Sequence, residues 1–483
     1  MTTVGSPGRV APANATPEPP MVASGQLRTL RTGRRALAIL GRLLPPALAG
    51  YALFDRGFAY IHIPGTPLFA GEFLMLVCVA GALVGTGYVR RGFQQSTAAK
   101  ALLVFAAWGM TRTIPFIGAN GIDAIRDAAL WYYALIAIPV CALVVTDPRL
   151  LPRWTRAYGR FIPWLLIYSP VALFLAKVAN NGFGPKVPSS GISIFDHKGS
   201  NVSVQVVVAL AFLWLVPRAG GRFRVHLSAL ATVVLLVGAT QGRSGFVAAA
   251  VALALVGYFS HGRGRLAFAM GATILVIVVL GWGLNVQIQG EQGRTISVNQ
   301  LAANLGSVVG ASNPQAPGNL NANVQFRDEL WSRTLHKVKA EGKVLTGLGF
   351  GLNIAKSVGL QGQSSIPLRS PHNSHLDVYA RMGAIGFAIW IAFWGLWCAA
   401  LLKARSRFRS LGRRIDMGLV EVCFVGAIAI LVNAYFDPSL ESPPVAIWLW
   451  TIVGVGLGLV ALARRATAAH AAEPTGTAVV IRR

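Results

Sequence analysis

Long apolar runs alternate with short polar connections along most of the chain. A helix that crosses a bilayer needs about 20 mostly apolar residues. Runs that approach this length are found at residues 36–53, 67–89, 100–118, 126–145, 161–178, 202–217, 226–241, 244–260, 266–284, 377–402, 416–436 and 443–463. This pattern predicts an all-α polytopic membrane protein with about twelve transmembrane helices. Arg42 and the Pro45–Pro46 pair interrupt the first run and make it the least regular of the twelve.

The connections between these runs differ in charge according to their position. Those after even-numbered runs are basic: RRGFQQSTAAK, TDPRLLPRWTRAYGR, RAGGRFR, HGRGR and KARSRFRSLGRR. Those after odd-numbered runs include NNGFGPKVPSSGISIFDHKGSN and FDPSLESPP, which are longer or acidic and poor in arginine. Arginine and lysine accumulate in cytoplasmic loops of membrane proteins. We therefore expect both termini to be cytoplasmic and the odd-numbered connections to be external, in a multi-pass membrane protein.

Composition supports membrane insertion and argues against nucleic-acid binding. The chain is 54% hydrophobic and 13% charged, whereas a soluble protein carries roughly 25% charged residues. The net charge of +27 comes from short clusters of lysine and arginine between the apolar runs. Membrane proteins carry such clusters in their cytoplasmic loops, where they determine the topology. The four cysteines lie inside apolar runs without metal-ligand spacing, so we expect neither a zinc site nor a disulfide framework.

One connection is much longer than the others. The predicted organisation is a disordered cytoplasmic tail at 1–35, transmembrane helices 1–9 at 36–284, an extracytoplasmic loop at 285–375, transmembrane helices 10–12 at 376–465 and a cytoplasmic tail at 466–483. A loop this long in a compact protein is usually functional or disordered. The segment RDELWSRTLHKVKAEG within it has the apolar spacing of an amphipathic helix. The following TGLGFGLN lacks the GK[ST] of a phosphate loop and reads as a tight turn.

Arg243 lies between the seventh and eighth runs, at the predicted external face. A cation at this depth is costly and is often functional. The alternative is an anchor that reaches the lipid headgroups. Arg327 and Arg333, with Trp331 between them, are further phosphate-binding candidates because a guanidinium binds phosphate oxygens bidentately. The alternative is a solvated helix face on which Arg333 pairs with Glu329.

The segment SPHNSHLDVYARMGAIGF places polar groups at the mouth of the tenth run. His372 and His375 could ligate a metal, but a third ligand and an HExxH framework are missing. A histidine that acts as a general base needs no such partners. The remaining interpretation is a helix cap, for which Asn373 or Ser374 is suited.

Taken in order, these motifs resemble the O-antigen ligase and polymerase family. The resemblance is carried by Arg243 after the seventh run, by Arg327 four residues before Trp331, by the GLGFG segment, and by PHNSHLDVYARMGAIG at the next helix. It covers most of the chain beyond residue 36. Arg333 falls outside the matched positions.

The resemblance implies an extracytoplasmic glycosyltransferase with a polyprenyl-diphosphate-linked glycan as donor and a lipid, wall polymer or protein as acceptor. It implies neither metal nor nucleotide, with His372 near the acceptor hydroxyl and Arg243 and Arg327 on the diphosphate. Trp331, Arg333, Asn373 and His375 are the other substrate-binding candidates. A polymerase that joins lipid-linked repeats is the alternative within the family. A lipid or solute transporter is the alternative of another class, although transporters usually show broken helices in paired positions.

Overall fold

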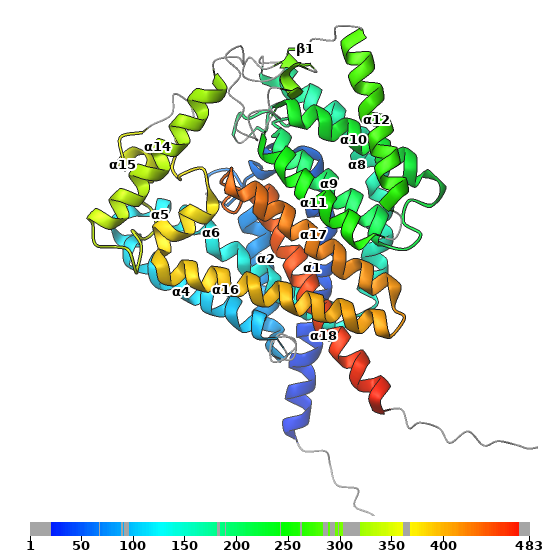
Figure 1. The fold of residues 1–483 in the computed structure, drawn as a ribbon. Coiled ribbons are helices and arrows are strands. Elements are labelled where there is room, and N and C mark those ends of the chain that lie inside the picture. Colours follow the sequence, from blue (N-terminus) through cyan, green and yellow to red (C-terminus); the bar gives the residue numbers. More distant parts are fainter. Residues whose placement is uncertain are drawn as a thin grey trace, which may run out of the picture.

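The computed structural model describes residues 21–66, 68–87, 90, 96–180, 184–188, 190–241, 243–260, 263–283, 288–289, 295–297, 299–302, 319–360 and 368–472. In these ranges nearly every element is a helix, and the two-residue strands β1 (Ile288–Gln289) and β2 (Thr295–Ile296) pair antiparallel. The predicted all-α class is therefore confirmed for the described part of the chain (Figure 1).

The helices follow the predicted apolar runs in order. The long ones are α1 (Met21–Ala59), α2 (Ala70–Val84), α4 (Thr97–Asn120), α8 (Leu150–Asn180), α9 (Gly199–Leu215), α10 (Arg224–Gln241), α11 (Arg243–Phe259), α12 (Arg263–Gly283), α14 (Asn319–Ala340), α16 (Ser374–Ser410), α17 (Arg414–Tyr435) and α18 (Pro443–Ala472). The short ones are α5 (Ile122–Asp127), α6 (Ala129–Tyr132), η1 (Tyr133–Ile136), α7 (Ala137–Thr146), η2 (Gly221–Phe223) and α15 (Ile354–Ser357). The fourth predicted run is thus a chain of short helices instead of one regular helix.

The helices have the length and surface of membrane-spanning segments. Among the described residues, eight helical stretches are long and apolar enough to cross a membrane, and α2, α9, α11 and α12 contain shorter apolar helices. On α8, Trp164, Ile167, Val171 and Phe174 form an exposed stripe, and such a surface is stable only against lipid or another protein. These are the features of a multi-pass membrane protein, and the number of twelve spans stays a prediction.

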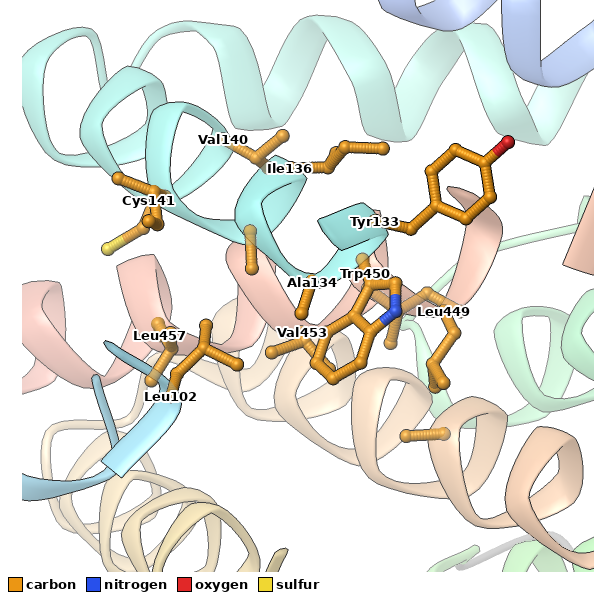
Figure 2. Packing of buried hydrophobic residues seen from close by; sticks show 14 of the residues in the cluster. Leu102, Tyr133, Ala134, Ile136, Val140, Cys141, Leu449, Trp450, Val453 and Leu457 are labelled. Carbon is orange, nitrogen blue, oxygen red and sulfur yellow. The ribbon is translucent and has the colours of Figure 1, made fainter. Parts of the chain in front are cut away.

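One large hydrophobic core joins η1, α7, α4 and α18 (Figure 2). Residues from η1 and α7 pack against α18 and α4; those labelled are Leu102, Tyr133, Ala134, Ile136, Val140, Cys141, Leu449, Trp450, Val453 and Leu457. Between membrane helices, close van der Waals packing replaces the hydrophobic effect as the main source of association. This packing fixes the start of α18 and therefore the end of the 436–442 connection that precedes it.

The first helix differs from its predicted form. It continues through Pro45 and Pro46, and its backbone leaves helical geometry at Asp55 instead (φ 44°, ψ −117°). Residues 21–35, predicted as tail, form the beginning of this helix, and α18 extends into the predicted C-terminal tail as far as Ala472. Residues 1–20 and 473–483 lie outside the described part of the chain.

The two described ends of the chain lie together. In Figure 1 the start of α1 and the end of α18 both lie at the bottom, whereas α14 lies at the upper left. The long connection between α12 and α16 is therefore built on a part of the molecule remote from both described ends. Of its residues, those in 284–287, 290–294, 298, 303–318 and 361–367 lie outside the described part.

Candidate active site at the mouth of helix α16

Asn373 caps helix α16, as the sequence suggested. Its Oδ1 accepts hydrogen bonds from the backbone N–H groups of His375 at 3.0 Å and Leu376 at 3.1 Å. An asparagine at this position satisfies amide groups that have no partner within the helix. The oxygen of Asn373 is thus engaged with the helix, and His372 stands directly outside it.

Ser374 joins the mouth of α16 to the connection between α17 and α18. Its hydroxyl donates to the backbone carbonyl of Asp437 at 3.0 Å and accepts from the N–H of Leu440 at 3.2 Å. Ser374 is fully buried, so both bonds are shielded from water. They fix Asp437 beside His372.

His372 occupies an unusual backbone conformation and a charged environment. Its φ of 54° lies in the left-handed region, where non-glycine residues are uncommon and His, Asn and Asp are enriched. Its Nδ1 is buried and has no hydrogen-bond partner among the described residues. The charges that act on it come from four separate elements: Asp437, Lys198, Arg327 and Arg56.

These surroundings keep the imidazole neutral. Burial lowers the pKa of His372 to about 4; Asp437 opposes the shift, while Lys198, Arg327 and Arg56 add to it. A neutral ring with an unoccupied nitrogen can accept a proton. The mouth of α16 therefore presents a base surrounded mainly by cations.

Asp55 and Lys198 build the floor of this site. Asp55 is 2% exposed and accepts hydrogen bonds from the backbone N–H of Lys198 at 2.7 Å and from Asn201 Nδ2 at 2.9 Å. The break in α1 at Asp55 thus holds the residue that precedes α9. The ammonium group of Lys198 in turn forms an ion pair with Asp437. Burial would raise the pKa of Asp437, but the charge and hydrogen bond of Lys198 bring it below its ordinary value.

Arg56 brings a second cation to the same place. Its backbone N–H donates to the carbonyl of Asp196 at 3.2 Å, and its guanidinium lies 3.8 Å from Asp196 Oδ1. Its side chain is 38% exposed, so the guanidinium remains accessible to a ligand.

Sequence reasoning missed Asp55, Arg56, Lys198 and Asp437. A signal was present, because only 17 of the 483 residues are acidic and three of these directly follow a phenylalanine in or beside an external connection. The three pairs are Phe54–Asp55, Phe195–Asp196 and Phe436–Asp437. The first two adjoin a cation of the site, and the third supplies the carboxylate that Lys198 binds.

Trp331 attaches α14 to the site. Its indole N–H donates to the carbonyl of Pro371 at 2.8 Å, and its ring contacts that of Tyr435, with centroids 5.5 Å apart. Because Pro371 directly precedes His372, this contact ties α14 to the base. Arg327 lies four residues earlier on α14, and its charge reaches His372.

Arg333 does not join this cluster. It pairs with Glu329, with Nη2 and Oε1 2.5 Å apart, and donates to the carbonyl of Val358 at 3.1 Å. Both charged side chains are about half exposed. This is the ion-paired helix face that the sequence left open as the alternative.

His375 also points away from the site. Its Nδ1 lies 3.2 Å from Trp390 Nε1, and its Nε2 lies 2.9 Å from the carbonyl of Leu431. An indole N–H can only donate, so Nδ1 accepts and Nε2 carries the proton that bonds Leu431. Nδ1 therefore bonds within α16, and Nε2 joins α16 to α17.

The side chain of Arg243 lies outside the described part of the structure, but its backbone position is informative. Helix α11 begins at Arg243. A Cβ built at Gly245 would lie 3.0 Å from Ser200 Cα, so the first turns of α11 and α9 are in close contact. The start of α11 is accordingly a neighbour of the segment that carries Lys198.

The GLGFG segment completes a break in α16. Gly383 has φ 70° and ψ −174°, which interrupts the helix and leaves backbone groups without intrahelical partners. The N–H groups of Leu348 and Gly349 donate to the carbonyls of Ala380 and Arg381, at 2.8 and 3.1 Å. The N–H groups of Ala384 and Ile385 donate in the opposite direction, to the carbonyls of residues 344 and 345, at 2.8 and 3.2 Å. The segment is thus a structural insert in the helix and, as the sequence indicated, no phosphate loop.

A buried ionic network holds the segment that leads to His372. Arg369 binds both carboxylate oxygens of Asp127 at 3.0 Å and contacts Asp123 at 3.1 Å. Burial would lower the pKa of Arg369, but the bonds and charges of Asp127 and Asp123 raise it instead. Arg381 is fully buried and bridges Asp127 and Asp377 at 3.1 and 3.0 Å. Removing one partner of such a network typically costs about 3–5 kcal/mol.

Glu441 adds a proton to the far side of this network. Burial and the nearby charge of Asp377 raise its pKa well above its ordinary value. A neutral Glu441 can donate a hydrogen bond to Asp377, so the two carboxyl groups can lie together in the interior.

No group of three or more His, Cys, Asp and Glu side chains within the described ranges is arranged to hold a metal ion. The mouth of α16 instead combines one base, His372, with the cations Arg56, Lys198 and Arg327. This combination suits an anionic ligand whose reaction requires a proton acceptor.

Residues 227–391 match the family model described as O-antigen ligase. Over these residues, about a third of the chain, the protein is similar to the O-antigen ligase family. The family resemblance found in the sequence is therefore confirmed. No curated protein matches the chain. The matched residues extend from α10 into α16 and include Arg327, Trp331 and His372, whereas Arg56, Lys198 and Asp437 lie outside them.

The pKa of His372 makes the stability of the protein depend on pH. An unfolded histidine titrates near 6.5 and folded His372 near 4, so between these values the unfolded state binds more protons. The unfolding free energy should fall by about 3 kcal/mol as the pH is lowered through this window. Thermal melting of the protein in detergent at pH 7 and pH 4 measures it, with His372→Asn as the control that lacks this contribution. An equally steep fall in the variant would contradict the assignment.

Proposed function

We propose that this protein is an extracytoplasmic glycan ligase that transfers a glycan from a polyprenyl-diphosphate donor to an acceptor hydroxyl. The observation that carries the proposal is the environment of His372. Its Nδ1 is buried without a hydrogen-bond partner among the described residues, and the charges of Lys198, Arg327 and Arg56 act on its ring. The family match supports glycosyl transfer as the class of reaction. The acceptor would be a lipid, a wall polymer or a protein.

Arg56, Lys198 and Arg327 are proposed to bind the diphosphate, together with Arg243 at the start of α11. When the bond between the sugar and the diphosphate breaks, negative charge accumulates on the leaving phosphate. Preorganised cations at a membrane edge stabilise this charge, and guanidinium groups bind phosphate oxygens in pairs. The ion pair with Asp437 would hold Lys198 in place before the donor arrives.

His372 is proposed to act as the general base. In the unliganded protein its pKa is lowered to about 4 by burial and by the surrounding cations. A bound diphosphate would offset those cations and favour the protonated ring, so the donor itself would strengthen the base. His372 then accepts the proton of the acceptor hydroxyl as its oxygen attacks the anomeric carbon. The new glycosidic bond forms, the polyprenyl diphosphate leaves, and the anomeric configuration inverts.

The remaining candidates take supporting roles in this proposal. Trp331 and Asn373 position α14 and the base through the contacts described above, and His375 stabilises the packing of α16. Neither metal nor nucleotide is required. The site would face the external side of the bacterial inner membrane, with residues 285–375 as the catalytic loop and both termini in the cytoplasm.

A polymerase is the second candidate, since the same site would serve an acceptor that is itself a lipid-linked repeat. The family match supports it equally. Mass analysis of the surface glycan in a deletion strain separates the two: a ligase leaves full-length lipid-linked polymer behind, and a polymerase leaves single repeats. A transporter would move the lipid without making a glycosidic bond.

The direct test is transfer by the purified protein in liposomes that contain a polyprenyl-diphosphate glycan, in the presence of a chelator. Arg56→Ala and Arg327→Ala should each lower the rate by about tenfold or more, since each removes a charged contact worth about 1.5–3 kcal/mol. Arg→Lys should restore only part of it, because an ammonium lacks the bidentate fork.

Arg333→Ala is the matched control, on the same helix as Arg327 but paired with Glu329, and should transfer at the wild-type rate. Lipid movement without a new bond would contradict the proposal. So would a requirement for a divalent ion, or an Arg333 variant more damaged than the Arg327 variant.

A further inference from the structure

An apolar groove opens beside the cation cluster and has no part in the chemistry described so far. It has a volume of about 690 Å³, within the range of roughly 300–1,000 Å³ that is usual for small-molecule pockets. Its walls come from the end of α1, from the residues that follow it and from the segment before α9. The residues that form these walls include Phe54, Phe58, Ile61, Val187, Pro188 and Ile194.

The walls of the groove are held in place by backbone hydrogen bonds. In the first segment, Ala70 N–H donates to the carbonyl of Ile61 at 2.8 Å. In the second, Val187 N–H donates to the carbonyl of Ile192 at 2.8 Å and Ile194 N–H donates to that of Pro185 at 3.1 Å. The groove is therefore a preformed feature of two hairpin-like loops.

The lining carries no acidic side chain. His62 is the lining residue with a polar side chain among those described, and its Nδ1 lies 3.2 Å from the carbonyl of Tyr60. The ring of His62 also contacts that of Phe69, with centroids 5.0 Å apart. An occupant would meet mostly hydrocarbon and aromatic surface.

The groove lies next to the two segments that carry Arg56 and Lys198. Gly57, which lines the groove, directly follows Arg56, and the lining residue Ile194 lies four residues before Lys198. The N–H of Arg56 is bonded to the carbonyl of Asp196, so α1 and the second wall meet at this point. An apolar groove next to segments that carry two cations fits an amphiphile whose anionic head is attached directly to its chain.

We propose that this groove binds the first isoprenoid units of the donor lipid, next to its diphosphate. The proposal rests on the proposed function and names the part of the protein that recognises the lipid. The donor fits better than an acceptor lipid because its phosphate and its first apolar carbons are joined by a single ester bond. The diphosphate would lie on Arg56 and Lys198, and the more distal units of the chain would continue into the bilayer.

Ile61→Trp and Ile63→Trp form a matched pair for testing the groove. Ile61 lines it and is 47% exposed, whereas Ile63, on the same loop, is outside the lining and 50% exposed. An indole at position 61 would occupy space in the groove without altering a charged residue. The same change at position 63 adds an equal apolar surface elsewhere.

The experiment measures binding of farnesyl diphosphate and of inorganic diphosphate to the purified full-length protein in detergent. Ile61→Trp should lower the affinity for farnesyl diphosphate about tenfold, the loss expected from about two fewer buried methylene groups. It should leave the affinity for inorganic diphosphate unchanged. Ile63→Trp should change neither. Unchanged inorganic diphosphate binding also shows that the variant is folded.

Three results would overturn the groove assignment. The first is unchanged farnesyl diphosphate binding in Ile61→Trp. The second is wild-type protein that binds farnesyl diphosphate no better than inorganic diphosphate. The third is that phosphatidylglycerol vesicles displace bound farnesyl diphosphate as effectively as a longer polyprenyl diphosphate does. The groove would then bind any lipid chain. Failure of wild-type protein to bind either diphosphate would instead overturn the proposed function together with the groove.

Discussion

Replacing His372 with asparagine should lower the rate of glycan transfer by about a hundredfold or more, the usual cost of losing a general base. Asparagine is the informative substitution because it tolerates the left-handed backbone that His372 adopts at φ 54°. Alanine in that conformation would add a backbone strain of about 1–2 kcal/mol. A lower transfer rate would then combine the effect of misfolding with that of losing the base. The transfer rate and the affinity for inorganic diphosphate should both be measured, and the affinity should remain because the cations are intact.

The control is the other histidine of the motif. His375→Asn removes a ring whose two nitrogens bond Trp390 and Leu431, so it should lower thermal stability while the folded fraction still transfers. If His372→Asn keeps a rate near that of the wild type, His372 is a structural residue of the helix mouth. If His375→Asn has the larger effect on the rate per folded molecule, the base has been assigned to the wrong residue.

Replacing Gly383 with alanine should prevent accumulation of folded protein in the membrane. A Cβ at this position would lie 2.2 Å from the carbonyl oxygen of Leu345 and 2.5 Å from the N–H nitrogen of Gly347. Both are backbone atoms, which cannot move without breaking the hydrogen bonds of the inserted segment. The positive φ of 70° adds a cost of about 1–2 kcal/mol for a residue with a side chain.

Gly395→Ala is the matched control for this prediction. Gly395 lies in the same helix, and a Cβ there would have no heavy atom within 4 Å. In a regular helix this change is expected to stabilise by up to about 1 kcal/mol. Membrane accumulation and detergent melting temperature of the two variants should therefore change in opposite directions. Equal behaviour would mean that the break in α16 does not require glycine.

The positions of the helices could be predicted from the sequence for a physical reason. A backbone in lipid must satisfy its own hydrogen bonds, so an apolar run of sufficient length becomes a helix. The same rule allowed α1 to continue through Pro45 and Pro46, which in a soluble protein would predict a break. The break at Asp55 was not predictable from local sequence, because it depends on bonds from Lys198 and Asn201, far along the chain.

Only those residues of the candidate site that lie within a recognisable sequence motif could be predicted. His372 and Trp331 lie in recognisable motifs, whereas Arg56, Lys198 and Asp437 come from three connections that the fold brings together. The three Phe-Asp pairs of the chain mark these connections, but a motif of two residues does not show that the three would meet in the fold. For Arg333 the sequence left both phosphate binding and pairing with Glu329 open, and in the structure it pairs with Glu329 one turn earlier.

The insert at Gly383 also affects how such an enzyme can diversify. The segment at residues 344–349 is held to α16 by backbone atoms on both sides, so its placement is largely independent of side-chain identity beyond its glycines. Under the proposed function, substitutions on the exposed face of α14 would leave the spacing of His372, Arg56 and Lys198 unchanged. Acceptor preference would then be free to change by point mutation without altering the groups proposed to carry the chemistry.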